Sequence, residues 1–497
     1  MADRQPFIWG SGSVLFSSSE FLLAFLPITL AIYFVLAAFR GTKHLLVFVT
    51  LASLFFYGYW KIEYLAIIVV SILGNFFVGR LITDFKAADR VPSAKLTATV
   101  GIILNLVGLG YYKYAGFLSI NVNALTGLDL PILDILLPLG ISFFTFQQIA
   151  YLADAFSGKV GRIDFFEYAA FVTFFPQLVA GPIVHYADMM PQFGRAVPYR
   201  QRLDDFALGS LIFAVGLAKK LVIADSVAPL VAQVFGISEA GPVGFVEAWA
   251  GALAYTVQLY FDFSGYSDMA VGIGLMFSIK LMWNFNSPYK SLSIVEFWRR
   301  WHISLSNWLR DYLYIAMGGN RRGEFRRYAN LFITMLLGGL WHGASWNFVI
   351  WGALHGVYLL IVHANRKLRT VVGLAPRTDN RAVLAVSWLA TFFCVVVAWV
   401  YFRAVDLGSA HAMLDAMLRP AGFAAAELSR FVSFEGLLVI FGLLIAFFAP
   451  NTPQIYDYVL ARRKGSYAIA AYAGVLFMLS VIVSMRVEES PFLYFNF

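Results

Sequence analysis

The sequence contains few charged side chains. Asp, Glu, Lys and Arg make up 13% of its 497 residues, whereas 60% of the residues are hydrophobic and the mean hydropathy is +0.72. Soluble globular chains carry about 25% charged residues. This deficit of charge excludes an ordinary soluble enzyme and predicts a protein that crosses a membrane several times.

Cysteine is almost absent as well. Cys394 is the single cysteine of the sequence, and it lies in an apolar run. One cysteine excludes an internal disulfide and a metal site built from several cysteines, so we interpret Cys394 as a buried thiol. The sequence also lacks a convincing phosphate-cradling loop, serine nucleophile elbow or catalytic cysteine motif.

Basic residues outnumber acidic ones, with 37 Lys and Arg against 29 Asp and Glu, a formal net charge of +8. In a membrane protein this excess is typical of basic cytoplasmic loops, and it does not indicate nucleic-acid binding. The basic residues cluster in five polar connections that we expect on the cytoplasmic side, at residues 80–90, 195–202, 320–327, 366–381 and 462–464.

Long apolar runs dominate the rest of the chain. They lie at about 21–38, 44–60, 64–82, 97–112, 131–152, 167–184, 205–234, 243–278, 329–363, 382–403, 433–450 and 467–485. Runs of this length are typical of membrane helices, and they are too long and continuous for barrel strands. We therefore predict an all-α polytopic membrane protein with about 11–13 membrane segments. The sequence shows no soluble domain between these segments and no internal repeat, so residues 1–497 are expected to form one integral-membrane domain.

One of these runs contains a histidine at membrane depth. His342 lies between Trp341 and Trp346 within the apolar stretch 331–358, and glycines precede and follow it. An ionisable side chain inside a membrane segment suggests a function, although a hydrogen-bonded core histidine is the alternative. The glycines either let helices approach closely or leave room for a substrate.

A second histidine occurs in an unusual segment, residues 293–317. Aromatic and aliphatic residues recur there at intervals of three and four, which predicts an amphipathic helix at the membrane edge: Trp298, Trp301, Leu305, Trp308 and Tyr312. His302 borders this apolar face, with Trp298 and Ser306 one turn away on either side. It precedes His342 by 40 residues, which leaves room for a loop and a new span, so the two imidazoles can converge.

A third histidine fits this arrangement less well. His355 follows His342 by 13 residues, which on one continuous helix means about 20 Å of rise and about 220° of rotation. We therefore expect at most a supporting role for it and assign catalysis to His342 and His302. The candidate substrate-binding residues lie close to these two in the sequence: Trp298, Ser306, Trp341, Trp346, Asn347 and Asp311.

Two histidines suit proton transfer. A neutral imidazole can accept a proton from an acceptor hydroxyl as that hydroxyl attacks a thioester. The other histidine can orient the first, hold the donor or stabilise the developing oxyanion. Two histidines without a third ligand make an incomplete zinc site, so we expect neither a metal nor a bound cofactor. The basic loop at 318–327 lies between the two histidine segments and is a candidate contact for an anionic donor or an acidic carrier protein.

The stretches 296–306 and 340–352 resemble the membrane-bound O-acyltransferase family, and within it the bacterial alginate O-acetyltransferase subgroup. Residues 14–18, 175–183, 260–268, 399–404 and 491–497 support this resemblance. The resemblance implies that His342 is the essential intramembrane histidine of the family and that His302 is the second histidine of the bacterial subgroup. It also implies a helical bundle with a central tunnel in the bacterial cytoplasmic (inner) membrane.

For function, the resemblance implies transfer of an acyl group, with acetyl favoured, towards an extracytoplasmic polysaccharide or partner protein. The donor would be acetyl-CoA or the thioester of an acyl carrier protein, used as a cosubstrate. Two alternatives remain at this stage. One is a transporter or flippase that moves the acyl or glycan substrate without chemistry, although the paired inverted repeats of many transporters are not visible. The other is an assembly subunit without catalytic activity.

Overall fold

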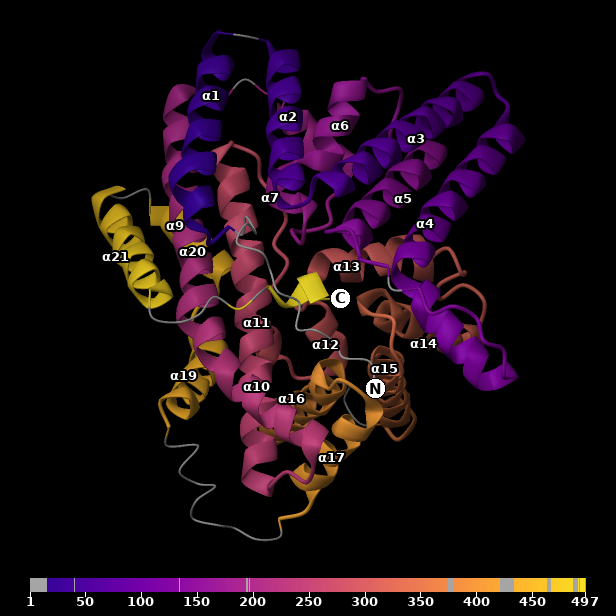
Figure 1. Ribbon diagram of the computed structural model, residues 1–497, viewed down its shortest axis with the longest axis vertical. Helices are drawn as coiled ribbons and strands as arrows, with labels where there is room; N and C mark the ends of the chain where they lie inside the picture. The colour runs from indigo at the N-terminus through magenta and orange to yellow at the C-terminus, as the bar shows by residue number, and fades with distance from the viewer. Residues whose placement is uncertain are drawn as a thin grey trace. The chain divides into compact units, whose positions relative to one another are not determined.

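The computed structural model describes residues 16–39, 41–133, 135–193, 195, 197–373, 380–420, 433–462, 466–485, 490 and 492–496. Every regular element within these ranges is a helix (Figure 1). The predicted all-α polytopic fold is confirmed. Residues 14–15, 374–379, 463–464, 491 and 497, to which parts of the sequence predictions refer, lie outside the described ranges.

The chain divides into two compact units. The first consists of Met1–Tyr112, Ile135–Phe213 and Met269–Met282, and the second of Lys113–Asp134, Ala214–Asp268 and Trp283–Phe497. That the whole chain forms one integral domain stays a prediction.

The first unit holds the N-terminal helices: η1 (Phe21–Phe25), α1 (Leu26–Phe39), α2 (Thr42–Trp60), α3 (Ile62–Ala87), α5 (Ile141–Ser157), α6 (Phe165–Thr173), α7 (Phe175–Leu178), α8 (Tyr186–Phe193) and the first parts of α4 (Val91–Thr126) and α9 (Tyr199–Ala218). Buried amide and hydroxyl groups form hydrogen bonds within it, and Gln148 is an example. Gln148 donates to Ser71 Oγ at 2.9 Å and accepts from the Tyr168 hydroxyl at 3.0 Å. Such pairing is required because an unpaired buried amide is costly.

The second unit holds the rest: η2 (Lys219–Ala224), α10 (Asp225–Ala240), most of α11 (Phe245–Met276), η3 (Pro288–Lys290), α12 (Ile294–Trp298), α13 (Ile303–Trp308), η4 (Leu309–Tyr314), α14 (Glu324–His342), α15 (Trp346–Val371), α16 (Arg381–Arg403), α17 (Leu407–Leu418), α19 (Phe434–Phe448), α20 (Thr452–Arg462), α21 (Ser466–Ser484) and η5 (Leu493–Asn496). Both candidate catalytic histidines belong to this unit.

Six helices among the described residues are long and apolar enough to cross a membrane: Phe21–Ala38, Ile62–Ala87, Val91–Thr126, Arg200–Glu239, Trp346–Val371 and Arg381–Arg403. A seventh span results if Glu435–Phe448 and Thr452–Ala461, which meet at a 52° bend, are counted together. Other apolar runs form short helices, such as the nine-residue α6 and the four-residue α7. The larger number of 11–13 segments and the central tunnel therefore stay predictions.

Helices α14 and α15 form a closely packed hairpin in the second unit. A Cβ atom at Gly339 would lie 2.3 Å from the Phe348 carbonyl oxygen, and one at Gly352 would lie 2.5 Å from the Met335 carbonyl oxygen. Small residues at such positions let the two backbones touch. This contact fixes the last turn of α14, where His342 lies.

We expect Gly339→Ala to destabilise the folded protein by about 1–3 kcal/mol, because the added methyl group overlaps backbone and not a flexible side chain. Thermal unfolding of the purified protein in detergent measures the effect. Gly108→Ala is the matched control, since a Cβ on that α4 glycine meets nothing within 4 Å. Equal melting temperatures for the two variants would contradict the close packing of α14 on α15.

Candidate active site

His342 is the last residue of α14. The chain turns at Gly343, where a Cβ atom would lie 2.1 Å from the Phe348 ring, and α15 begins three residues later at Trp346. The helix end therefore leaves the imidazole buried, with 2% of the residue exposed.

Two side chains of α4 cap this helix end. Lys113 Nζ donates to the Trp341 carbonyl at 2.5 Å, and the Tyr114 hydroxyl donates to the Leu340 carbonyl at 2.7 Å. The last carbonyls of a helix have no partner within the helix, and a cation is favoured at this negative end. The Lys113 ammonium also lies 5.6 Å from the Trp341 ring centroid. Lys113 thus fixes the backbone directly before His342.

We expect Lys113→Met to lower the turnover number about tenfold, because it removes a charge-assisted hydrogen bond next to His342 while keeping the apolar stem. Lys113→Arg, which keeps the charge and the donors, should recover most of the rate. Steady-state kinetics on purified protein separates this effect on turnover from an effect on KM. An unchanged turnover number in Lys113→Met would contradict a positioning role for the lysine.

His302 lies at a break between helices and not within one. The predicted amphipathic helix is divided into α12, α13 and the π-helical η4, and His302 precedes α13 with φ +43° and ψ +55°. A left-handed backbone is uncommon for a residue with a Cβ atom, and the surroundings must compensate for it. The compensation comes from Asn284, whose carbonyl oxygen accepts from the Ile303 N–H at 2.9 Å.

The Asn284 side chain also determines the tautomer of His302. Its Oδ1 accepts from the Ser304 N–H at 3.1 Å and the Ser304 hydroxyl at 3.0 Å, and it lies 3.2 Å from His302 Nδ1. A backbone N–H can only donate, so this amide atom is the oxygen, and Nδ1 must carry the proton that it shares with Oδ1. The lone pair of the neutral imidazole is therefore on Nε2.

The two imidazoles converge, and a tyrosine borders both. The ring centroids of His302 and His342 are 6.5 Å apart, and that of Tyr494 lies 6.0 Å from His302 and 5.6 Å from His342. Tyr494 comes from η5 near the end of the chain, and Figure 1 shows this segment reaching α13. Three separate segments thus meet at one buried point.

Aromatic rings surround these three residues. The ring centroid of His342 lies 5.0 Å from that of Trp351 and 5.1 Å from that of Phe402. The ring centroid of Phe263 lies 4.7 Å from that of His302 and 4.0 Å from that of Tyr494. Such walls exclude water and lower the local dielectric constant, which strengthens any electrostatic interaction inside.

The site contains buried polar atoms without a partner. Nδ1 of His342 is buried and has no hydrogen-bond partner among the residues that the structure describes, as is also true of Nε1 of the neighbouring Trp351. Leaving a buried polar atom unpaired costs about 1–3 kcal/mol, and such atoms occur where strain, water, a ligand or a catalytic role explains them. Together with the neighbouring Nε2 lone pair of His302, it marks this point as the candidate active site.

The predicted substrate-binding residues are distributed unevenly around this point. Trp341 joins the site, with its ring 5.0 Å from His342 and 6.0 Å from His302. Trp346 is 53% exposed and donates to Asn121 Oδ1, and Asp311 is paired with Arg310 on the surface. The structure does not bring these last two residues to the histidines.

The other three lie nearby but have partners of their own. Trp298 donates to His355 Nδ1 at 3.3 Å. The Ser306 hydroxyl donates to the Trp301 carbonyl at 3.3 Å, and Asn347 donates to the Ala404 carbonyl at 2.7 Å. Their substrate-binding roles stay predictions. The ring centroid of Trp351 lies 4.7 Å from that of His355 and 5.0 Å from that of His342. Because α14 ends at His342 and α15 begins at Trp346, the expectation based on one continuous helix does not apply, and a supporting role for His355 stays a prediction.

Several residues of the site were not singled out from the sequence: Tyr494, Asn284, Phe263 and Lys113. The sequence does carry weak signals for two of them. Lys113 directly follows the apolar run 97–112 and is a charged residue within the candidate span Val91–Thr126, which is unusual at membrane depth. Asn284 lies in the run Asn284–Pro288, whose asparagines, serine and proline are typical of a loop. Neither signal identifies a catalytic site.

Comparison with known proteins gives consistent matches. The model of the membrane-bound O-acyltransferase family matches residues 141–404, which include His302 and His342. The peptidoglycan O-acetyltransferase of Helicobacter pylori is 38% identical over 97% of this chain and 98% of its own length. A probable alginate O-acetylase of Pseudomonas putida is 41% identical over 97% of this chain and 100% of its own length.

A more distant relative, the teichoic acid D-alanyltransferase of Streptococcus thermophilus, is 29% identical over 53% of this chain and 68% of its own length. All three relatives are named for the transfer of an acyl group, which favours an enzyme over the transporter alternative. The apolar helices and the family match make the protein a multi-pass membrane enzyme. The chain belongs to the membrane-bound O-acyltransferase family.

Proposed function

We propose that this protein transfers an acetyl group from a cytoplasmic thioester towards a polysaccharide, or a partner protein that modifies one, on the outer side of the bacterial cytoplasmic membrane. The observation that carries the proposal is the convergence of His302 and His342, whose ring centroids are 6.5 Å apart, at a buried aromatic site. Acetyl is favoured because relatives of nearly full length are named as O-acetyltransferases or O-acetylases. The acceptors in these names, peptidoglycan and alginate, are both glycans.

His342 is the proposed general base. Its imidazole accepts the proton of an acceptor hydroxyl while that oxygen forms a bond to the thioester carbonyl carbon. The resulting tetrahedral intermediate collapses, the carbon–sulfur bond breaks, and the departing thiolate takes the proton back from His342. An oxygen ester and a free thiol are the products, so no oxidant or metal is needed for the balance.

His302 is proposed to assist as a hydrogen-bond acceptor. Because Nδ1 shares its proton with Asn284, the neutral ring offers a lone pair at Nε2 and cannot donate to a developing oxyanion from that atom. Orientation of the acceptor hydroxyl or of the protonated His342 fits this tautomer better than oxyanion stabilisation. Trp341, Trp351 and Phe402 around His342 would keep water from hydrolysing the thioester.

The donor is proposed to approach from the basic loop at residues 318–327. Its arginines suit the phosphates of acetyl-CoA or the acidic surface of a carrier protein. Residues 324–327 of this stretch form the first turn of α14, which starts at Glu324 and ends 18 residues later at His342, a rise of about 27 Å. A donor bound at the loop would therefore need to extend its thioester arm along this helix.

Comparison of surface glycans tests the proposal. Mass spectrometry of glycans from wild-type and deletion strains should show loss of O-acetyl groups from one polymer, and re-expression of the chain should restore them. Purified protein should release thiol from acetyl-CoA or from an acetylated carrier protein, which identifies the donor. Unchanged acetylation of every surface glycan in the deletion strain would contradict the proposed function.

A further inference from the structure

Two consecutive lysines of η2 pair with two different aspartates of α11. Lys220 Nζ lies 2.6 Å from Asp225 and 2.9 Å from Asp262, while Lys219 Nζ lies 2.6 Å from Asp268. A π-helical turn such as η2 is rare and occurs frequently at functional sites. Here it lets neighbouring lysines serve separate ion pairs.

The Lys220 network is buried and its charges do not balance. The side chains of Lys220, Asp225 and Asp262 are at most 3% exposed, and one ammonium faces two carboxylates. Buried charges are costly unless further hydrogen bonds satisfy them. Additional donors are therefore needed at this point.

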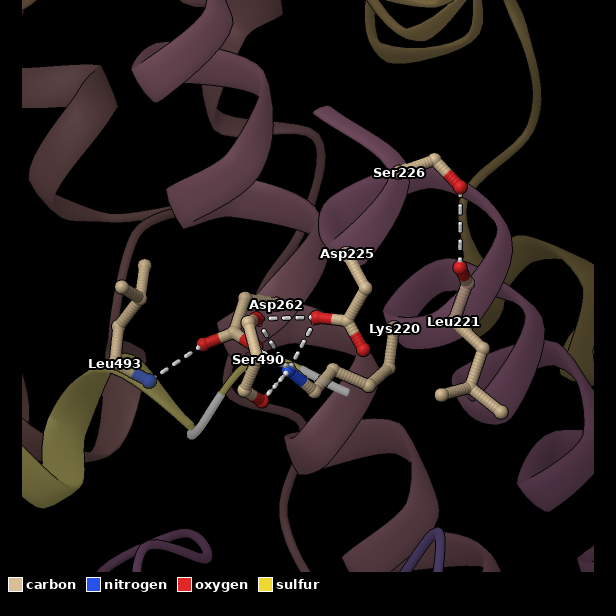
Figure 2. A network of polar contacts seen from close by, with 7 residues as sticks. All are labelled: Lys220, Leu221, Asp225, Ser226, Asp262, Ser490 and Leu493. Carbon is tan, nitrogen blue, oxygen red and sulfur yellow. Dashed lines mark hydrogen bonds and ion pairs between the residues drawn. The ribbon is translucent and has the colours of Figure 1, made fainter. Parts of the chain in front are cut away.

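The C-terminal segment, of which the structure describes residues 490 and 492–496, provides these donors. The Leu493 N–H donates to Asp262 Oδ2 at 3.0 Å, and the Ser490 hydroxyl donates to Asp225 (Figure 2). In return, the Ser490 carbonyl accepts from Lys220 at 2.8 Å. The end of the chain thus supplies one donor to each carboxylate and accepts from the ammonium, while Asp225 Oδ2 has no hydrogen-bond partner among the described residues.

The same contacts place Tyr494. It directly follows Leu493, and its ring packs 4.0 Å from Phe263, the residue after Asp262 on α11. Phe492 stacks on Tyr266 of the same helix at 4.4 Å. The backbone and the aromatic rings of the C-terminal segment therefore contact α11, close to the two histidines.

We propose that Lys220, Asp225 and Asp262 form a latch that fixes the C-terminal segment and holds Tyr494 against His302 and His342. The three latch residues are positioning residues, because they act on the site through Tyr494. The importance of the latch for turnover rests on the proposed function. Its effect on the C-terminal segment does not, so the two can be tested separately.

Asp268 offers a matched control. It is buried on the same helix and pairs with Lys219, the neighbour of Lys220, but it anchors Thr452 at the start of α20. Asp268→Asn therefore removes a comparable buried charge from a network in which no contact with the C-terminal segment is found among the described residues.

The test uses the full-length purified protein with Asp262→Asn, Asp268→Asn or no change. Carboxypeptidase Y digests each protein under native conditions, and mass spectrometry follows the loss of Tyr494. We expect Tyr494 to be released about 10- to 100-fold faster from Asp262→Asn than from wild type, because a hydrogen bond to a charged group is weakened. Turnover in acetyl transfer should fall with little change in KM, while Asp268→Asn should resemble wild type in both measurements.

Ser490→Ala removes only one hydrogen-bond donor, and it replaces Asp262→Asn in this test if that variant fails to fold. It should accelerate the release of Tyr494 in the same direction by a smaller factor. Wild-type release rates in the folded latch variants, or equal acceleration in Asp268→Asn, would overturn the proposal. Because release of Tyr494 does not depend on catalysis, a wild-type protein without acetyl transfer would count against the proposed function and not against the latch.

Discussion

Replacement of His342 by glutamine is expected to lower the rate of thiol release from the acetyl thioester about 10²- to 10⁴-fold, the usual contribution of a general base. Glutamine is polar and can occupy a similar space, but it has no nitrogen that accepts a proton near neutral pH. The KM for the thioester should change little, because the variant removes an interaction that gains strength only in the transition state.

His411→Gln is the control for this measurement. His411 is exposed on α17, where its ring contacts Tyr401, and it takes no part in the site. Its rate should equal that of the wild type. A His342→Gln protein that binds the thioester normally and retains a rate within a few-fold of wild type would remove His342 from the catalytic role.

Replacement of Asn284 by leucine is expected to destabilise the fold and to reduce turnover at the same time. Three donors converge on Asn284 Oδ1: the Ser304 N–H, the Ser304 hydroxyl and His302 Nδ1. Each buried donor left without an acceptor costs about 1–3 kcal/mol. The left-handed backbone at His302 would also lose part of the support that compensates for its strain.

Asn284→Asp separates the two effects. Its carboxylate keeps an acceptor oxygen for the Ser304 N–H, so the melting temperature should stay closer to that of the wild type than in Asn284→Leu. Thermal unfolding in detergent and turnover are measured on the same preparations. Equal melting temperatures for Asn284→Leu and the wild type would show that this amide does not hold the helix break.

The membrane character and the two histidines follow from the sequence for simple physical reasons. Charge depletion and long apolar runs reflect the burial of side chains in lipid, which composition reports directly. His342 and His302 are conspicuous because ionisable residues are rare in such surroundings. The limited role expected for His355 assumed one continuous helix, but α14 ends at His342 and α15 begins at Trp346, so that geometric argument does not apply and the role of His355 stays a prediction.

The break at His302 could not be predicted in the same way. The apolar periodicity of residues 298–312 continues across residues 299–302, although the helix does not. At the break, Asn284, 18 residues earlier in the chain, binds residues 302–304, and periodicity carries no information on such a partner. Tertiary contacts of this kind override local helix preference.

Closeness to His342 in the sequence also failed to predict which residues line the site. Trp346 lies four residues after His342, but the turn at Gly343 and the start of α15 place its ring at the surface. Tyr494, which borders both histidines, lies 152 residues after His342. Its position depends on α11 and on the buried charges around Lys220, which sequence spacing does not reveal.

The acetyl content of surface polysaccharide in cells that carry His342→Gln as their only copy tests the two-histidine acyl-transfer site most directly. The variant protein must be present in the membrane at the wild-type amount. Transfer through this site predicts that acetylation falls to the level of the deletion strain. Acetylation at the wild-type level would contradict it.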